Sequence, residues 1–330
     1  MANLIHGRAP ALATAFLGCC GAVAGAAQAA APPSEIVIPG ERIFPESLTS
    51  SADGSVFIGS IQARTIFRAR PGAAMAEPWI KPGTDDLQSI FGVLADDRSH
   101  TLWACSSTPA FGPAGDTPRA PAALYAFDLK TGAPRGHYVF PSAGALCNDI
   151  AVAPDGTAYA TDTTNMEVVR LKKGAKALEV WAGNGAFGPK GGVLDGISVL
   201  GKRVLVNALA TSKLFSVPVN GDGTAGTVVE VKLDRPIERP DGMRAFGQDG
   251  LLVVEGGHGG RLSQVTLSRD SGVATTIKEG YPDGPVAVTV VGTTAYVLEG
   301  QLALMMRRAP ATTDSPAKPF RATAVPVGKP

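Results

Sequence analysis

Four side chains that carry oxygen ligands recur at one position of a repeated pattern in this 330-residue sequence. Each stands at the start of an apolar run that is followed by a tight turn and a second apolar run. The four are Glu46, Asn148, Asp195 and Asp241. Oxygen ligands without histidine or cysteine favour Ca²⁺, Mg²⁺ or Mn²⁺, and Zn²⁺ also accepts carboxylate oxygens. If the fold brings the four together, they predict a site for one divalent cation, with Ca²⁺ as the first candidate. The alternative is that they are solvated polar residues at strand starts.

The pattern that carries these residues occurs six times. In "CNDIAVAPDGTAYATD" (147–162) an apolar run, a Pro-Asp-Gly turn and a second apolar run predict a β-hairpin. Related segments recur along the chain at intervals of 44 to 56 residues. Aligning their first strands places six residues in one register, namely Glu46, Gly92, Asn148, Asp195, Asp241 and Pro285.

Two further strand-like runs lie between successive hairpins, such as "MEVVRLKKG" (166–174) and "ALEVWAG" (177–183). Each unit therefore has four strands, which is the size of a propeller blade. The intervals lack the long amphipathic helix that a parallel α/β fold would need. The sequence predicts an all-β protein, a single six-bladed β-propeller over residues 31–330, in which segments 34–40 and 320–327 complete the last blade.

The propeller architecture decides where the polar residues lie. The first strand of each blade lines the central channel and the second returns beside it, so the six register positions form a ring around one mouth. The second strands end at the same mouth, and their last residues are Ser60, Ser106, Asp162, Asn207, Glu255 and Glu299. We expect Asp162 and Asn207 to contact a substrate, with capping of a loop as the alternative.

Two loops leave the same mouth. The long Pro- and Gly-rich segment 107–121 is expected to cover the channel. The segment "GGHGGR" (256–261) follows Glu255, which together with His258 completes the predicted substrate-contacting set. His258 is a candidate general base, because its unperturbed pKa is near neutrality. A lone histidine in a Gly-rich loop is more often a solvated or structural residue.

The order and spacing of these motifs resemble the senescence marker protein/gluconolactonase family, the regucalcin-like lactonases. The motifs "PES", "CNDIAVAPDG", "LDGISV" and "RPDGM" fall where that family places its metal-binding Glu, Asn, Asn and Asp. The resemblance covers nearly the whole chain after residue 31. It implies a six-bladed propeller that holds one divalent cation in its channel, and in many members hydrolysis of sugar lactones.

Two positions depart from the family pattern. Asp195 replaces the usual Asn by a carboxylate, which favours binding of a hard cation. Leu146 stands where sugar lactonases of the family often have an Arg, two residues before Asn148. The loss of that strong hydrogen-bond donor argues against gluconolactone as the substrate.

Lactone hydrolysis requires a polarised carbonyl and an activated water. A divalent cation supplies both, and a neighbouring carboxylate can accept the proton of the water. We therefore predict a metal-dependent lactonase-type hydrolase that acts on a small lactone or related cyclic ester, with Asp241 as metal ligand and general base. The alternative is a non-enzymatic, exported propeller that binds a ligand or a protein, because fold alone does not determine activity.

The N-terminus predicts export. After Arg8, the apolar stretch 11–27 is followed by Ala27-Gln28-Ala29, which is typical of a secretory signal peptide over residues 1–30. We expect a periplasmic or secreted protein with no transmembrane span in the mature chain. A lipoprotein site at Cys19 is an alternative that Phe16 fits poorly.

The composition of the remaining chain bears on which kinds of partner it can bind and on the state of its cysteines. The formal net charge is +1 and no basic or acidic block occurs, so no nucleic-acid partner is expected. Removal of the signal leaves Cys105 and Cys147. Two cysteines in a chain of this size do not form a disulfide framework, and they are either paired or two buried thiols.

Overall fold

The computed structural model describes residues 1, 2, 4, 7, 32–108, 120–306 and 318–329. Pro32–Pro330 form one compact unit, distinct from Met1–Ala31. The predicted signal peptide and most of the predicted lid, residues 109–119, lie outside the described residues. In the described part of the chain, no helix has the length and apolar character needed to cross a membrane.

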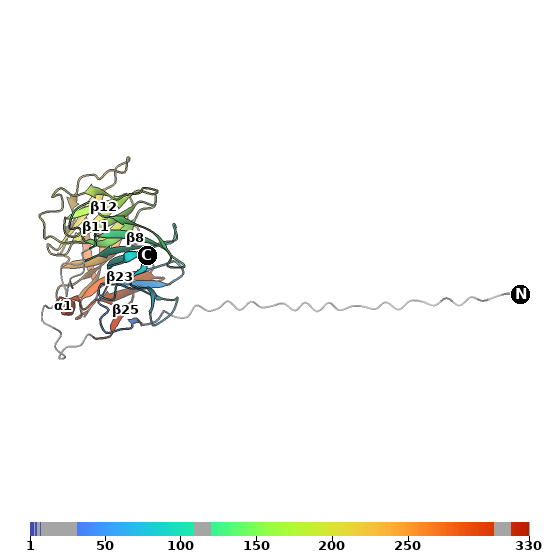
Figure 1. Cartoon of the computed structure of the whole chain (residues 1–330). Coiled ribbons are helices and arrows are strands. Elements are labelled where there is room, and N and C mark those ends of the chain that lie inside the picture. Colours follow the sequence, from blue (N-terminus) through green and yellow to red (C-terminus); the bar gives the residue numbers. More distant parts are fainter. Residues whose placement is uncertain (3, 5–6, 8–31, 109–119, 307–317, 330) are drawn as a thin grey trace. The chain divides into compact units, whose positions relative to one another are not determined.

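The compact unit contains six sheets of four or five strands, and the first strand of each sheet contacts the first strand of the next around a closed ring. Figure 1 shows that this unit consists almost wholly of strands. The predicted all-β, six-bladed propeller is confirmed. Blade 1 consists of β2 (Pro45–Ser50), β3 (Val56–Ser60), β4 (Ile66–Ala69) and β5 (Glu77–Ile80). Blade 2 consists of β6 (Ser89–Asp96), β7 (Thr101–Ser107), β8 (Ala123–Asp128) and β9 (Pro134–Val139). Blade 3 consists of β10 (Cys147–Val152), β11 (Ala158–Asp162), β12 (Glu167–Leu171) and β13 (Glu179–Ala182).

The second half of the ring repeats this order. Blade 4 consists of β14 (Leu194–Leu200), β15 (Arg203–Ala208), β16 (Lys213–Pro218) and β17 (Val229–Glu230). Blade 5 consists of β19 (Pro240–Phe246), β20 (Gly250–Glu255), β21 (Arg261–Ser268) and β22 (Ser271–Glu279), with β18 (Lys232–Leu233) parallel to β22. Blade 6 consists of β23 (Pro285–Val291), β24 (Thr294–Glu299), β25 (Phe320–Pro326) and β1 (Glu35–Ile38). The described residues also form two short helices, η1 (Thr84–Asp86) and α1 (Leu302–Met305).

The two ends of the propeller sequence meet in blade 6. β1 pairs antiparallel with β25, from Glu35 opposite Thr323 to Ile38 opposite Phe320. The strand from the start of the chain therefore completes a sheet built from its end, as expected for segments 34–40 and 320–327. Backbone hydrogen bonds of this pairing thus join the two ends of the propeller sequence in one blade and hold the ring closed.

The hydrophobic core lies between neighbouring blades. Tyr159 and Trp181 of blade 3, for example, pack in one cluster with Val204 and Phe215 of blade 4. Every residue of β11 is buried, because both faces of the strand are covered by adjacent blades. This explains why the inner strands read as short continuous apolar runs rather than as an alternation of apolar and polar residues.

Glycine allows the inner strands to approach one another. A Cβ atom at Gly196 would lie 2.5 Å from the carbonyl oxygen of Asp241, and one at Gly242 would lie 2.7 Å from that of Val286. Both distances are too short for any other residue. The Asp-Gly pairs in "LDGISV" and "RPDGM" therefore combine an acidic side chain with a backbone that fits tightly at the channel.

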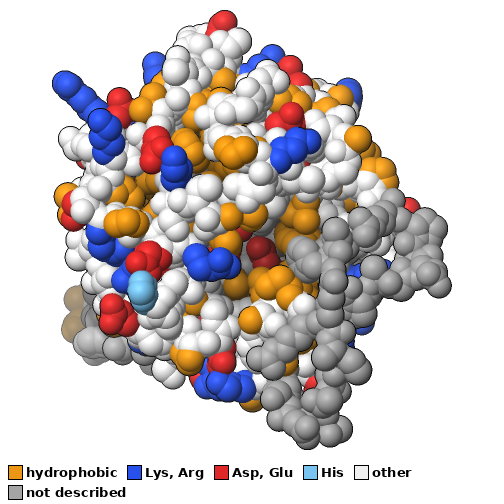
Figure 2. Space-filling view, turned by 90° about the vertical axis from the view of Figure 1, so that its left-hand side faces the viewer, with side chains coloured by type: hydrophobic (Ala, Val, Ile, Leu, Met, Phe, Trp, Pro, Cys, Tyr) orange, Lys and Arg blue, Asp and Glu red, His pale blue; other side chains and the backbone are white. Residues whose placement is uncertain are grey.

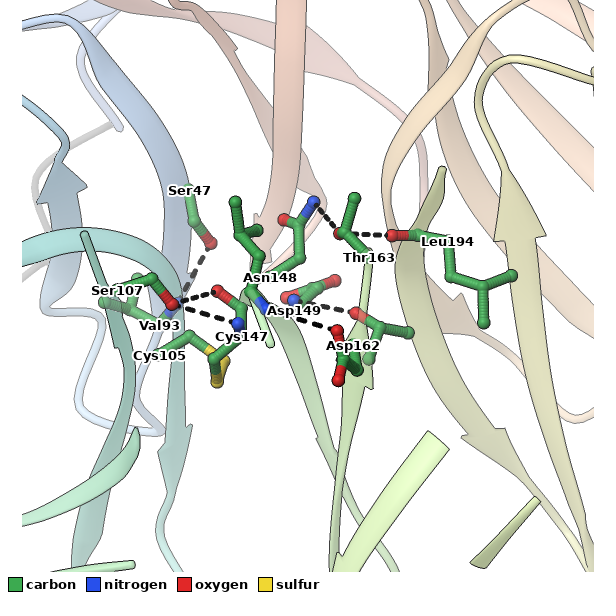
Figure 3. The surroundings of a disulfide bond; sticks show 12 residues. Ser47, Val93, Cys105, Ser107, Cys147, Asn148, Asp149, Asp162, Thr163 and Leu194 are labelled. Atoms are coloured by element: carbon green, nitrogen blue, oxygen red, sulfur yellow. Dashed lines mark hydrogen bonds between the residues drawn. A yellow bond between two sulfur atoms is a disulfide. The ribbon is translucent and has the colours of Figure 1, made fainter. Parts of the chain in front are cut away.

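Cys105 of β7 and Cys147 of β10 form a disulfide between blades 2 and 3, with their Cα atoms 5.1 Å apart (Figure 3). Of the two states that the sequence left open, the structure has the paired one. The bond lies directly before Asn148, so it anchors the start of an inner strand at the point where that strand carries a candidate ligand.

Candidate metal centre

All six inner strands carry a β-bulge at their first residues. In β10, Cys147 pairs with Asp162 but the next paired residue is Ile150, opposite Ala160. Asn148 and Asp149 thus share the single opposing residue Thr161. A bulge bends the strand and re-aims its side chains. An apolar strand can therefore open with two polar residues, because these residues leave the regular ladder at the channel.

The bulges define the ring of side chains at the channel mouth. The equivalent positions directly follow the last residue that is paired before the bulge of each inner strand, and they are Glu46, Phe91, Asn148, Asp195, Asp241 and Val286. The register predicted from sequence was wrong by one residue in blades 2 and 6, where it placed Gly92 and Pro285. The predicted ends of two second strands were also wrong by one residue, since β7 ends at Ser107 rather than Ser106 and β15 ends at Ala208 rather than Asn207. These shifts arise because the hairpin turns differ in length and because each bulge adds a residue to the inner strand. The apolar pattern of the sequence does not reveal that added residue.

Three acidic side chains of the ring converge. Ligand oxygens of Glu46, Asp195 and Asp241 all lie within 4.8 Å of one another. Glu46 and Asp195 are buried, with 6% and 5% of their surface exposed, and Asp241 is half-buried. Oxygens at this separation can share one hard cation. The structure thus brings together three of the four predicted metal ligands in one cluster.

The fourth predicted ligand, Asn148, has an unpaired acceptor. Its Nδ2 donates to Thr163 Oγ1 at 3.0 Å, whereas its Oδ1 is buried and has no hydrogen-bond partner in the described part of the chain (Figure 3). A buried polar atom without a partner costs about 1–3 kcal/mol. A cation among the three carboxylates would give this oxygen a partner. The four side chains therefore fit a divalent ion with oxygen ligands.

The electrostatics of the cluster also fit a cation. Burial raises the pKa of Glu46 well above its usual value, and the charges of Asp195 and Asp149 raise it further. Burial likewise raises the pKa of Asp241, with Asp195 and Glu46 adding to the shift. For Asp195, burial and the charge of Asp149 raise the pKa to about 7, against opposing contacts with the side chains of Asp241 and Asn148. Without a positive charge among them, these acids hold protons that carboxylates normally release.

Hydrogen bonds from the preceding blade hold the strands that carry Asp195 and Asp241 in place. Thr161 Oγ1 donates to the carbonyl oxygen of Asp195 at 2.8 Å. Asn207 Nδ2 donates to the carbonyl oxygen of Asp241 at 2.6 Å, and its Oδ1 accepts from Gly196 N at 3.1 Å. Asn207 therefore links blade 4 to blade 5. Its position is set by the ligand strands, which explains a buried amide at the end of an apolar strand.

A left-handed backbone conformation precedes each carboxylate ligand by two residues. The φ angles are 45° at Phe44, 60° at Val193 and 49° at Arg239. Such values are uncommon for residues other than glycine, and for a β-branched residue such as Val193 they are outliers. Strained conformations of this kind concentrate at functional sites. Here they turn the chain into the channel directly before the ligand.

The remaining predicted site residues are engaged in other contacts. The carboxylate of Asp162 accepts hydrogen bonds from the backbone of Leu146, Thr164 and Asn165, each at 3.1 Å. These bonds stabilise the turn that leaves β11. For Asp162 they match the capping alternative, whereas the side chain of Asn207 bonds to inner strands and caps no loop. Contact of either with a substrate stays a prediction.

Glu255 and His258 lie in a separate group of charges. Glu255 is fully buried and pairs with Arg235 at 3.0 Å and with Arg261 at 3.2 Å. His258 has a side chain that is 76% exposed, and its Nε2 lies 2.8 Å from Glu238 Oε2. Their contact with a substrate also stays a prediction. The buried carboxylate of Glu255 thus pairs with two arginines, and it also accepts a hydrogen bond from the backbone N–H of Glu238, the partner of His258.

An ion pair that the sequence did not reveal lies in the channel. Arg244 Nη1 donates to Asp149 Oδ2 at 2.8 Å, and Nη2 donates to the carbonyl oxygens of Val93 at 3.2 Å and Leu48 at 3.4 Å. Arg244 thus connects blade 5 with blades 1, 2 and 3. The sequence contains one sign of this ion pair. Arg244 is a charged residue within an inner strand, three residues after Asp241, where most positions are apolar.

An acidic side chain is recessed below one face of the molecule. Figure 2 shows a face on which an acidic side chain lies in a hollow among hydrophobic side chains. Two ring members, Phe91 and Val286, are likewise buried and apolar. A molecule that enters a channel of this composition meets apolar walls as well as oxygen ligands.

Comparisons with solved structures support the fold. The major allergen Mala s 1 of Malassezia sympodialis has a TM-score of 0.69 at 14% identity, over 89% of this chain and 96% of that protein. A gluconolactonase from Xanthomonas campestris has a TM-score of 0.57 at 14% identity, with 79% and 84% covered. Regucalcin from Agrobacterium tumefaciens, a calcium-binding protein, has a TM-score of 0.57 at 14% identity, with 89% and 97% covered. No family model and no curated protein matches the sequence.

These neighbours include the two kinds of protein that the sequence motifs resemble, a gluconolactonase and a regucalcin. At 14% identity the likeness concerns the fold alone, because one fold supports many unrelated functions. The chain therefore shares its six-bladed propeller architecture with a lactonase and a calcium-binding protein, and its function must be argued from its own site.

Proposed function

We propose that the protein is a metal-dependent hydrolase of the lactonase type, which acts on a lactone or related cyclic ester in the propeller channel. One observation carries the proposal. The oxygens of three carboxyl side chains lie within 4.8 Å of one another, next to a buried amide oxygen of Asn148 that has no partner among the described residues. Such a set is costly to bury without a cation and suits a hard divalent ion, with Ca²⁺ first and Zn²⁺, Mg²⁺ or Mn²⁺ as the other candidates.

The four side chains have different roles in the proposed reaction. Glu46, Asn148 and Asp195 are buried and would hold the ion. Asp241 is less buried and would also take the proton of an attacking water, which requires a carboxylate that solvent and substrate can reach. Asp241 Oδ1 accepts a hydrogen bond from Gly242 N at 2.9 Å, which fixes its orientation. A bound divalent ion supplies polarisation of the ester carbonyl and a more acidic water.

The polarity of the channel bears on the substrate class. Leu146, half-buried at the mouth, cannot donate a hydrogen bond from its side chain. Phe91 and Val286 add apolar surface to the ring that carries the ligands. We propose a lactone with fewer hydroxyl groups than a sugar lactone, since a polyhydroxylated ring would leave hydroxyl groups without partners against these side chains.

The test is turnover by the purified protein against a panel of lactones and linear esters of graded polarity. Each substrate is assayed as isolated, after EDTA treatment, and after addition of Ca²⁺, Mg²⁺, Mn²⁺ or Zn²⁺. We expect hydrolysis that EDTA abolishes and one cation restores. Absence of turnover across the panel, with every cation, would favour a ligand- or protein-binding propeller instead.

We also propose that the protein is exported. The Cys105–Cys147 disulfide supports this, because such bonds persist mainly in oxidising compartments. Mass spectrometry of the protein from a periplasmic or culture fraction tests the proposal. A mature chain that starts near residue 30 is expected, and retention of residues 11–27 would overturn it.

A further inference from the structure

We propose that the protein has a second small-molecule site at the opposite end of the blades, which binds an organic anion with a flat apolar body. A cavity of about 280 Å³ lies there between blades 2 and 3. Its walls include the turn after β6, the turn after β10 and the turn after β12. The inner strands begin at the ring of ligands and end at these turns, so this cavity is separate from the candidate metal centre.

Two aromatic rings form the apolar part of the wall. Trp103 of β7 and Tyr138 of β9 have ring centroids 6.5 Å apart and planes inclined by 41°. The two rings are not stacked face to face, so they do not fully cover one another. Leu171, 4% exposed, adds aliphatic surface from blade 3. Aromatic and aliphatic walls of this kind bind a flat apolar group by burial of its surface.

The charges around the cavity favour an anion. Three cationic side chains line it, and two of them are already paired: Arg98 Nε lies 3.2 Å from Asp96 Oδ1, and Lys172 Nζ lies 3.3 Å from Glu179 Oε1. The third, Lys173, forms no ion pair with any described residue. Its side chain lies against the β10–β11 turn, because a Cβ atom at Gly156 would be 3.1 Å from Lys173 Cδ.

The two carboxylates that line the cavity are each held by another group. Asp96 accepts from Arg98 and from Ser99 Oγ, the latter at 2.6 Å. Asp155 Oδ1 accepts from Thr157 N at 2.8 Å within its own turn. The ammonium group of Lys173 is therefore the charge left to pair with a ligand, and a carboxylate or sulfonate is the group that complements it.

The test measures binding of 1-naphthoate, an aromatic carboxylate, to the purified protein by isothermal titration calorimetry. We expect saturable binding with a Kd below about 1 mM. The uncharged 1-naphthamide should bind about fivefold more weakly, since it lacks the charge that pairs with Lys173. Lys173→Gln should weaken naphthoate binding by a similar factor and leave naphthamide binding unchanged. Lys176→Gln, an exposed lysine outside the cavity, is the matched control and should bind naphthoate like the wild type.

Two further variants separate this site from the channel. Trp103→Phe should weaken binding, whereas Trp79→Phe, at a tryptophan that does not line the cavity, should have no effect. Asp241→Ala should bind naphthoate like the wild type. The proposal is overturned if naphthoate does not bind saturably, if Lys173→Gln and Lys176→Gln bind it alike, or if Asp241→Ala abolishes binding, which would place the ligand in the channel.

Discussion

Arg244 and Asp149 form an ion pair in the propeller channel although they are 95 residues apart and belong to blades 5 and 3. Their side chains are 13% and 6% exposed, and Nη1 lies 2.8 Å from Oδ2. The pair acts on the metal centre through its charges, since Arg244 lowers the pKa of Glu46 whereas Asp149 raises the pKa of both Glu46 and Asp195. The channel thus contains a permanent cation from the protein beside the site proposed for a divalent one.

Loss of the arginine alone should be more damaging than loss of both partners. Arg244→Met leaves Asp149 buried without its cation and should lower the free energy of unfolding by about 3–5 kcal/mol. The double variant Arg244→Met/Asp149→Asn removes both charges and should recover part of that loss. Urea denaturation of the wild type, both single variants and the double variant gives the coupling energy. Additive effects of the two substitutions would show that the pair has no net coupling.

The two aspartates of the centre should respond differently to the same chemical change. Asp241→Asn keeps an oxygen ligand but cannot accept a proton, so kcat should fall by about 10²–10⁴-fold while the protein still folds. Asp195→Asn is the matched control, because this residue is assigned to metal binding only. It should keep most of the metal affinity and lose less kcat than Asp241→Asn. Metal analysis and steady-state kinetics on both variants provide the comparison, and equal losses of kcat would argue against Asp241 as the base.

Stabilisation by Ca²⁺ should grow with pH. Asp195 has its pKa raised to about 7 in the folded protein, and an unfolded aspartate has a pKa of about 3.9. A raised folded-state pKa contributes stability that is present below about pH 4 and lost as the pH rises through about 7. Over that window the metal-free protein loses this contribution, whereas a cation binds the deprotonated carboxylates.

The measurement for this prediction is the difference in Tm with and without Ca²⁺ between pH 4 and 8, which cancels groups that do not touch the ion. The difference should be small at pH 4 and increase toward pH 7 and above. Asp195→Asn should flatten part of the curve, because the residue no longer titrates. A Ca²⁺-induced shift that is independent of pH would contradict the assignment of these carboxyl groups as ligands.

The disulfide should contribute to stability through the loop that it closes. Cys105 and Cys147 are 42 residues apart, and closing a loop of this length stabilises the folded state by about 4 kcal/mol in the chain-entropy model. The double variant Cys105→Ser/Cys147→Ser should therefore have a lower Tm than the wild type. Dithiothreitol should lower the Tm of the wild type and leave that of the double variant unchanged. If the reductant shifts both proteins equally, the bond is not the cause.

The fold and the three clustered carboxylate positions could be predicted from the sequence because each depends on a local pattern that recurs. A hairpin repeated six times sets the number of blades, and an acidic or amide residue at its start marks the channel. The shifts at Gly92 and Pro285 could not be foreseen, since a β-bulge adds a residue without changing the apolar pattern. The Asp149–Arg244 pair was also hidden, because it joins blades whose relative rotation is fixed only by the closed ring.

The amide of Asn148 provides a test in which metal-free and metal-bound stability should move in opposite directions. Asn148→Leu removes an oxygen that is buried without a partner among the described residues, together with a 3.0 Å bond to Thr163 and a side-chain contact with Asp195. The hydroxyl of Thr163 keeps its bond to the carbonyl oxygen of Leu194. Replacing an unsatisfied buried group by an apolar one is nearly neutral or stabilising, so the Tm of EDTA-treated protein should stay equal or rise. The same substitution removes a ligand, so the Tm increase on adding Ca²⁺ should shrink.

Thr163→Val is the control, because it removes the partner of Nδ2 and keeps Oδ1; its Ca²⁺-induced shift should stay close to that of the wild type. If Asn148→Leu retains the full shift, Asn148 is not a ligand, and the carboxylates of Glu46, Asp195 and Asp241 must account for any binding by themselves.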